Sequence, residues 1–456
     1  MLFRSLSGRI HSKLEITQIR DLLPPEQAEQ IQDFKIQGQC LATTRFSGSL
    51  KKGSSVETEY SVSLENGSLK NEAKHIDWSG VSGELSMNTR GIEATDVRFV
   101  SAEKPYQLRL FVPKDKTAAG WAQIESQGLR VKIDYYLEAD GLRIPKGEFF
   151  WPGVNAAFRG RLTHWADPHL SLKGEVEAAL EQLPQLKAAE ISGTLRGPFE
   201  LEGPLNRWLD SEFKMDAESA LVRVKRTLQM GKFQLQLRMK NRLVNLPYIH
   251  ANFYGGTLGS RILFDLTKPK PFFDSKTYLN AVDLSGLGKD LTPPNLKLAG
   301  QMVAQVAARG EVGVPQSYRG QGAVSITQGY IFQSDKFKDM GNLPLVKVEG
   351  LDLVTFHEMN AEFNIHDQKL NTDNLTLMSE AVDISLKGHL TFDGALDMLM
   401  NIQYSEDVYR GAAETGGIVP LVVRQAGNFI SQYHVRGSLN QPQFEKMLLP
   451  TGRIFN

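Results

Sequence analysis

The residues between 382 and 404 place an apolar side chain at almost every second position, with mostly polar residues between them. Successive side chains of a β-strand point to opposite faces, so this alternation predicts strands with one apolar and one polar face. The apolar positions are Val382, Ile384, Leu386, Leu390, Phe392, Leu396, Met398, Met400 and Ile402. The same alternation returns at Phe233, Leu235, Leu237 and Met239. A chain that repeats this pattern is expected to be mostly β.

The turn at residues 393–395 decides whether this alternation stays in phase. A two-residue Asp-Gly turn would pair Phe392 with Ala395 and move Leu396 to the polar face. Keeping Leu396 on the apolar face therefore needs a three-residue or bulged connection. We expect Gly394 to supply the positive φ that such a connection requires.

Short alternating runs separated by Gly, Pro, Asn or Asp recur along the chain, as is typical of hairpins. They lie at residues 6–16, 60–64, 83–87, 106–112, 130–137, 157–162, 170–176 and 190–195. We therefore predict an all-β fold, mostly β with a few short helices, whose strands follow one another as an open meander. If about 25 strands stack at about 4.8 Å, the sheet would extend on the order of 120 Å.

Three segments favour short helices. Residues 24–31 begin with prolines, residues 175–186 carry leucines near helical spacing, and residues 421–433 follow Pro420. We expect the last of these helices to cover one end of the sheet, because exposed sheet edges invite aggregation.

Composition excludes several classes of protein. Lys plus Arg equals Asp plus Glu at 52 each, so no bulk charge would attract nucleic acid. The single cysteine, Cys40, excludes an intramolecular disulfide. No run of about 18 apolar residues predicts a membrane span, and the first residues lack a signal-peptide core. Because residues 6–16 already have the pattern of a strand, we expect a fragment or a late start within a longer protein.

Catalytic and cofactor motifs fail at essential positions. The run 286–289, Gly-Leu-Gly-Lys, lacks the upstream glycine of a phosphate loop and favours a turn after Asp283. His357 begins a zinc-type His-Glu pattern, but Ala361 stands where the second histidine is needed. Residues 164–169 hold two histidines and an aspartate, yet an Asp-Pro turn is the better interpretation, since no further ligand cluster is suggested. We expect no catalytic residues, no metal site and no cofactor.

Four segments in order resemble the AsmA family of bacterial envelope proteins, which includes TamB and YhdP and is related to bridge-like lipid-transfer proteins. The agreement in order and spacing extends over residues 206 to about 450, whereas the first 200 residues match only in their general alternating pattern. Proteins of this family usually begin with a membrane anchor, which this chain does not show. The matching segments are the Tyr-Gly-Gly hairpin at 251–260, the strand at 320–331, the meander from 361 through 379 to Gly388, and the closing strand at 433–444.

The resemblance implies an elongated, twisted antiparallel sheet curled into a U-shaped β-groove whose apolar concave face carries phospholipid acyl chains. It also implies a periplasmic protein of the Gram-negative cell envelope, associated with the inner membrane in its full-length form and acting in outer-membrane biogenesis. Its partners would be phospholipid acyl chains, the inner and outer membranes and envelope proteins. Candidate groove-lining residues are Phe233, Leu235, Leu237, Met239, Val382, Ile384, Leu386, Leu390, Phe392, Leu396, Met398, Met400 and Ile402.

Three alternatives stay open at this point. One-sided alternation most often means a sheet that buries its apolar face in a sandwich core. A structural or interaction protein that assists outer-membrane protein assembly would instead use exposed strand edges. A polysaccharide-binding solenoid ranks last, because the five tryptophans share no common spacing. We divide the chain into a repetitive β segment at 1–205 and an AsmA-like groove region at 206–456.

Overall fold

A computed structural model describes residues 5–15, 35–49, 56–71, 76–225, 227–291, 298–331, 354–380, 382–405, 423–425, 428–438 and 441–447. In these residues 26 strands belong to one antiparallel sheet, and strands that follow one another in the chain are neighbours in the sheet, with an exception near the C-terminal end. There the strand at 395–404 pairs with the strand at 428–438 and not with the short strand at 423–425. The sheet does not close on itself. The predicted fold class, an all-β antiparallel sheet curled into a groove, is confirmed.

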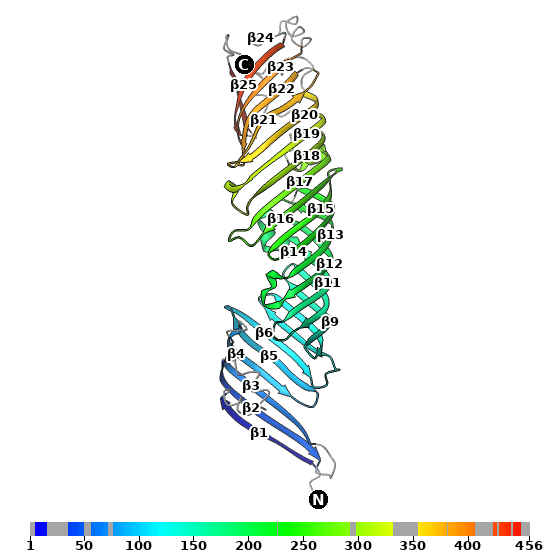
Figure 1. Cartoon of the computed structure of the whole chain (residues 1–456), viewed down its shortest axis with the longest axis vertical. Helices are drawn as coiled ribbons and strands as arrows, with labels where there is room; N and C mark the ends of the chain where they lie inside the picture. Colours follow the sequence, from blue (N-terminus) through cyan, green and yellow to red (C-terminus); the bar gives the residue numbers. More distant parts are fainter. Residues whose placement is uncertain are drawn as a thin grey trace. The chain divides into compact units, whose positions relative to one another are not determined.

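The chain packs as two compact units, residues 1–183 with 196–211 and residues 184–195 with 212–456. Figure 1 shows the strands of each unit stacked in chain order. The division at residue 205 that the sequence suggested stays a prediction, because it concerns where the AsmA-like region begins rather than how the chain packs.

Unit 1 is a meander of eleven complete strands among the residues that the structure describes. They are β1 (Ser5–Glu15), β2 (Lys35–Ser49), β3 (Val56–Asn71), β4 (Ile76–Met87), β5 (Gly91–Ser101), β6 (Lys104–Pro113), β7 (Gly120–Ser126), β8 (Leu129–Glu138), β9 (Gly141–Trp151), β10 (Val154–Thr163) and β11 (His169–Ala179). The 3₁₀ helices η1 (Leu180–Gln182) and η3 (Leu205–Asp210) also belong to it, and β12 (Ser192–Pro204) contributes residues to both units.

Unit 2 continues the meander with β13 to β26, one α-helix and two 3₁₀ helices. Its strands are β13 (Glu212–Val224), β14 (Leu228–Lys240), β15 (Leu243–Phe253), β16 (Gly256–Asp265), β17 (Phe272–Asp283), β18 (Leu298–Glu311), β19 (Arg319–Ile331), β20 (Val354–His366), β21 (Lys369–Met378), β22 (Val382–Thr391), β23 (Ala395–Tyr404), β24 (Val423–Gln425), β25 (Asn428–Ser438) and β26 (Gln441–Met447). The helices are η2 (Pro184–Ala189), α3 (Leu284–Leu291) and η4 (Pro315–Ser317).

The β22–β23 turn has the geometry that the sequence predicts. Leu390 pairs with Leu396, so residues 384, 386, 396, 400 and 402 share one face. Three residues connect the strands, and Gly394 has φ +91°. The Thr391 hydroxyl accepts a hydrogen bond from the Ala395 amide at 2.8 Å, which fixes the turn.

Two of the predicted helices are wrong. In the segment 175–186, β11 runs to Ala179 and is followed by η1 and η2. The leucines at 180, 183 and 186 repeat every three residues, which is the 3₁₀ period, and Leu183 is extended because a proline follows it. The segment 421–433 contains the hairpin of β24 and β25, so its described residues do not form the predicted helix. Residues 24–31 lie outside the described part of the chain.

The segment after Asp283 is also different from the predicted turn. Residues 284–291 form α3, the one α-helix in the described residues. The Asp283 carboxylate accepts hydrogen bonds from the Ser285 amide at 3.0 Å and the Ser285 hydroxyl at 2.7 Å. This carboxylate occupies the N-cap position, which favours a helix over a simple turn.

Candidate functional site

One face of unit 1 carries apolar side chains in register from strand to strand. Cross-strand partners lie on the same face of a sheet, so the pairing identifies continuous rows. What we call the unit-1 row crosses β5 to β11 and consists of Val97, Leu108, Ile124, Val131, Phe149, Ala156 and Val176. All seven side chains are half-buried. We call this surface the apolar face of unit 1.

The apolar face is most open at its N-terminal strands. Tyr60, Met87 and Ile92 are cross-strand neighbours on β3, β4 and β5. Their exposed fractions are 44%, 45% and 42%. Large apolar side chains of a sandwich core would be covered, so this part of the face has no covering layer among the described residues.

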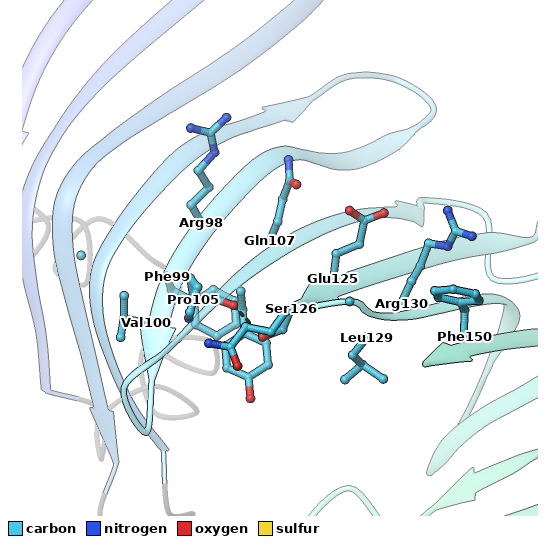
Figure 2. A pocket seen from close by; sticks show the side chains of 14 residues that line it. Arg98, Phe99, Val100, Pro105, Gln107, Glu125, Ser126, Leu129, Arg130 and Phe150 are labelled. Carbon is cyan, nitrogen blue, oxygen red and sulfur yellow. Dashed lines mark hydrogen bonds between the residues drawn. The ribbon is translucent and has the colours of Figure 1, made fainter. Parts of the chain in front are cut away.

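The opposite face of unit 1 is polar and charged. Figure 2 shows Arg98, Gln107, Glu125 and Arg130 on one side of the strands, with Phe99 and Leu129 on the other. These residues line a shallow hollow of about 570 Å³ at the ends of the β5–β6 and β7–β8 hairpins. Arg98, Gln107, Glu125 and Arg130 are cross-strand neighbours in that order, so polar and oppositely charged groups lie side by side, which is typical of a solvated outer face.

Unit 2 has an apolar face of the same kind. What we call the unit-2 row crosses seven strands from β17 to β23, and every member is apolar. It consists of Val282, Met302, Ile326, Met359, Leu377, Ile384 and Ile402. A parallel row from β15 to β20 contains Ala251, Leu258, Leu279, Ala304, Val324 and Ala361.

This face of unit 2 is concave near one rim. Tyr318 directly precedes β19, and Phe392 directly follows β22, three strands away. Their ring centroids are nevertheless only 6.4 Å apart. On a flat sheet three strand spacings would separate them by about 14 Å. Phe273 of β17 contacts Tyr318 from the other side at 5.3 Å. The apolar face is therefore the inner face of the curl.

The thirteen predicted lining residues all have backbone positions on this face of unit 2, but they differ in depth. Met398, Met400 and Ile402 form a buried cluster with Tyr433 and Val435. Phe392 is 45% exposed at the turn. Of Val382 only the backbone pairing is described. Half-buried side chains complete the set: Phe233, Leu235, Leu237, Met239, Ile384, Leu386, Leu390 and Leu396.

Helix α3 lies on the apolar face at the rim where β17 ends. Its buried leucines, Leu284 and Leu287, form a cluster with Phe253 and Val282. Partly buried side chains around this cluster include Leu258, Leu279, Met302 and Ile326, which belong to the two rows.

Two polar contacts hold the ends of α3 in place. The Tyr254 hydroxyl donates a hydrogen bond to the Asp290 carboxylate and accepts one from the Gln229 amide at 3.3 Å. Burial and the contact with Asp290 raise the pKa of Tyr254 to about 12. The Ser285 hydroxyl and amide hold the pKa of Asp283 below its usual value, so the cap is ionised at neutral pH.

Sequence reasoning missed most members of the two rows. Met302, Ile326 and Met359 sit in alternating runs that the sequence contains, but only the register shows that they continue the row to Ile384. The whole unit-1 row was missed for the same reason. Alternation within each strand was the available signal, and it does not say which residues of neighbouring strands are partners.

Several kinds of chemistry are not supported by the described residues. No group of three or more His, Cys, Asp or Glu side chains in them could hold a metal ion. No helix in the same part of the chain has the length and apolar character to span a membrane. Comparison with known proteins gave no matching family model, no matching curated protein and no matching solved structure.

Proposed function

We propose that the chain is a non-enzymatic carrier or conduit for phospholipids, whose acyl chains lie along the apolar faces of the two units. The observation that carries this proposal is the presence of in-register apolar rows on a single sheet layer, most of whose members stay partly exposed. All seven members of the unit-1 row and four of the unit-2 row are half-buried, whereas Val282, Leu377 and Ile402 are buried. A packed sandwich would cover them. The proposed setting is the periplasm of a Gram-negative cell envelope, between the inner and outer membranes, and it rests on the AsmA resemblance alone.

The energetics of acyl chains favour such a surface. Each methylene removed from water gains about 0.8 kcal/mol, and this gain is non-directional. A continuous apolar row therefore lowers the free energy of a chain at every position along it without a specific contact. No nucleophile, acid or base is needed for this task.

The dimensions of the rows suit acyl chains that run across the strands. Each row has six strand spacings of about 4.8 Å, or about 29 Å. The hydrocarbon core of a bilayer is about 30 Å thick and contains two leaflets. One row is therefore long enough for about two acyl chains end to end.

A charge on the apolar face tests the proposal. We expect Leu237→Arg to reduce phospholipid transfer between donor and acceptor vesicles by at least about tenfold, because a desolvated guanidinium disfavours acyl chains beside it. Leu237 suits this test because it is half-buried. A lysine at Met400 would instead destabilise the buried cluster, since that side chain is only 5% exposed.

Gln234→Arg is the matched control. Gln234 is exposed on the same strand but on the opposite face. Equal transfer by wild type and both variants, with circular dichroism showing an intact fold, would contradict the proposal.

The free edges of the sheet favour a second candidate. In the described residues β1 is hydrogen-bonded to β2 alone and β26 to β25 alone. An unpaired edge can add a strand from a partner, as a protein that assists outer-membrane protein assembly would require. Proline at alternate positions of β1 should then abolish partner binding, while Leu237→Arg should leave it unchanged.

A further inference from the structure

Helix α3 covers part of the surface on which the proposed acyl chain would lie. It connects β17 to β18 and packs on β18, with Leu284 and Leu287 buried against the apolar face. Met302 and Ile326, the second and third members of the unit-2 row, lie in this contact. An acyl chain that followed the row to its first strands would meet the two leucines.

The sequence of α3 gives it little stability of its own. It has eight residues, whereas isolated helices shorter than about 12 residues are marginal in water. Gly286 and Gly288 lie inside it, and glycine is the poorest helix former after proline. The helix therefore depends on its contacts with the sheet.

Those contacts are of two separable kinds. The leucines bury apolar surface on the row, and a lipid methylene could cover the same atoms at a similar gain. The Asp283 cap and the Tyr254–Asp290 hydrogen bond hold the ends of the helix without using the row. A lipid bound along the row would thus compete with the helix for one apolar surface, and the two polar contacts would favour the helix.

We propose that α3 is a displaceable plug over an acyl-chain subsite formed by Leu258, Leu279, Met302 and Ile326. This inference rests on the proposed function. When the subsite is filled by an acyl chain, Leu284 and Leu287 leave the apolar face and α3 opens. The plug regulates how far along the unit-2 row a lipid can pass.

Hydrogen exchange of the full chain tests the plug directly. We expect vesicles of dioleoylphosphatidylcholine to speed amide exchange of residues 284–291 by at least about fivefold, while the β22–β23 turn is unchanged. If the chain takes up phospholipid and exchange of 284–291 stays the same, the plug is overturned and the carrier function stands. If the wild-type chain takes up no phospholipid, both are overturned.

Variants that release the helix provide the second arm. Asp283→Ala combined with Tyr254→Phe removes both polar contacts and keeps the Tyr254 ring. Loss of an N-cap alone raises the opening constant about fivefold, so we expect at least that increase in the rate of phospholipid uptake. An unchanged rate would overturn the plug.

Asp265→Ala is the matched control. Asp265 accepts hydrogen bonds from the amide and hydroxyl of Thr267, as Asp283 does from Ser285, but in a hairpin turn. It should leave uptake unchanged. Asp283→Asn keeps a good cap and should restore most of the wild-type rate, which a general folding defect would not explain.

Discussion

At the residue scale, the apolar positions of β22 and β23 share a face but do not share a role. Ile402 has no exposed surface, whereas Leu396 is half-buried and Phe392 is 45% exposed. Alternation in the sequence predicted the face correctly. It could not predict depth, because the residues that bury Ile402 include Tyr433 and Val435 of β25, and a helix was expected over residues 421–433.

Ile402→Ala should therefore test packing rather than transport. We expect it to lower the free energy of unfolding by about 2–5 kcal/mol, because it leaves a cavity among closely packed side chains. Gln403→Ala, at the exposed neighbouring position, should change it by less than about 0.5 kcal/mol. Denaturant unfolding of both variants measures the difference, and equal small effects would show that the cluster is not a packed core.

Asp397 and His434 give a pH-dependent test of the outer face. The His434 ring contacts the Asp397 carboxylate at 2.6 Å and holds its pKa below the usual value, with smaller contributions from His389 and Arg436. A depressed folded-state pKa stabilises the fold above the unfolded aspartate pKa of about 3.9 and loses that effect as pH falls through the folded value.

His434→Gln should accordingly raise the pKa of Asp397 towards its ordinary range. The difference in the free energy of unfolding between variant and wild type should have its full size at neutral pH, where Asp397 is ionised. It should vanish in acid, where Asp397 is protonated in both proteins. Carboxyl chemical shifts and unfolding midpoints across pH check both statements. His389→Gln should have the smaller effect, and a larger one would contradict the assignment of the main cause to His434.

At the scale of elements, turn chemistry was predictable where one geometry satisfied the alternation. The three-residue connection at 392–394 followed from the requirement that Leu390 and Leu396 lie on the same face of the sheet. The helices were not predictable in the same way, because leucines at every third or fourth residue do not occur only in α-helices. They also occur where a strand is followed by 3₁₀ helices, as in residues 175–186. Tertiary pairing overrode weak local preference in the 421–433 segment, where β25 pairs with β23.

Gly394→Ala isolates the backbone requirement of that turn. A Cβ at Gly394 would meet no atom within 4 Å, so its cost arises from the positive φ alone. We expect a loss of about 1 kcal/mol in stability. Gly259 also has open space around its Cβ position but lacks a positive φ, so Gly259→Ala should not destabilise the protein. Equal losses in thermal unfolding would contradict this reason.

At the scale of the whole molecule, the decisive distinction is between an uncovered apolar face and a sandwich core. Sequence alternation is the same in both, so the pattern alone favoured the commoner sandwich. The register and the exposed row Tyr60–Met87–Ile92 distinguish the two, because they depend on how distant strands pair and on whether a second layer exists. Equal numbers of acidic and basic residues add no long-range field, which leaves the apolar faces as the main candidate for ligand binding.

Site-specific photo-crosslinking to phospholipid tests the central claim most directly. Ile92 and Leu237 lie on the apolar faces of units 1 and 2, and Val303 is an apolar side chain with 49% exposure on the opposite face. With a photoreactive residue at each position in turn, the account predicts lipid adducts at Ile92 and Leu237 and almost none at Val303. Equal labelling at all three positions, or none at any, would contradict it.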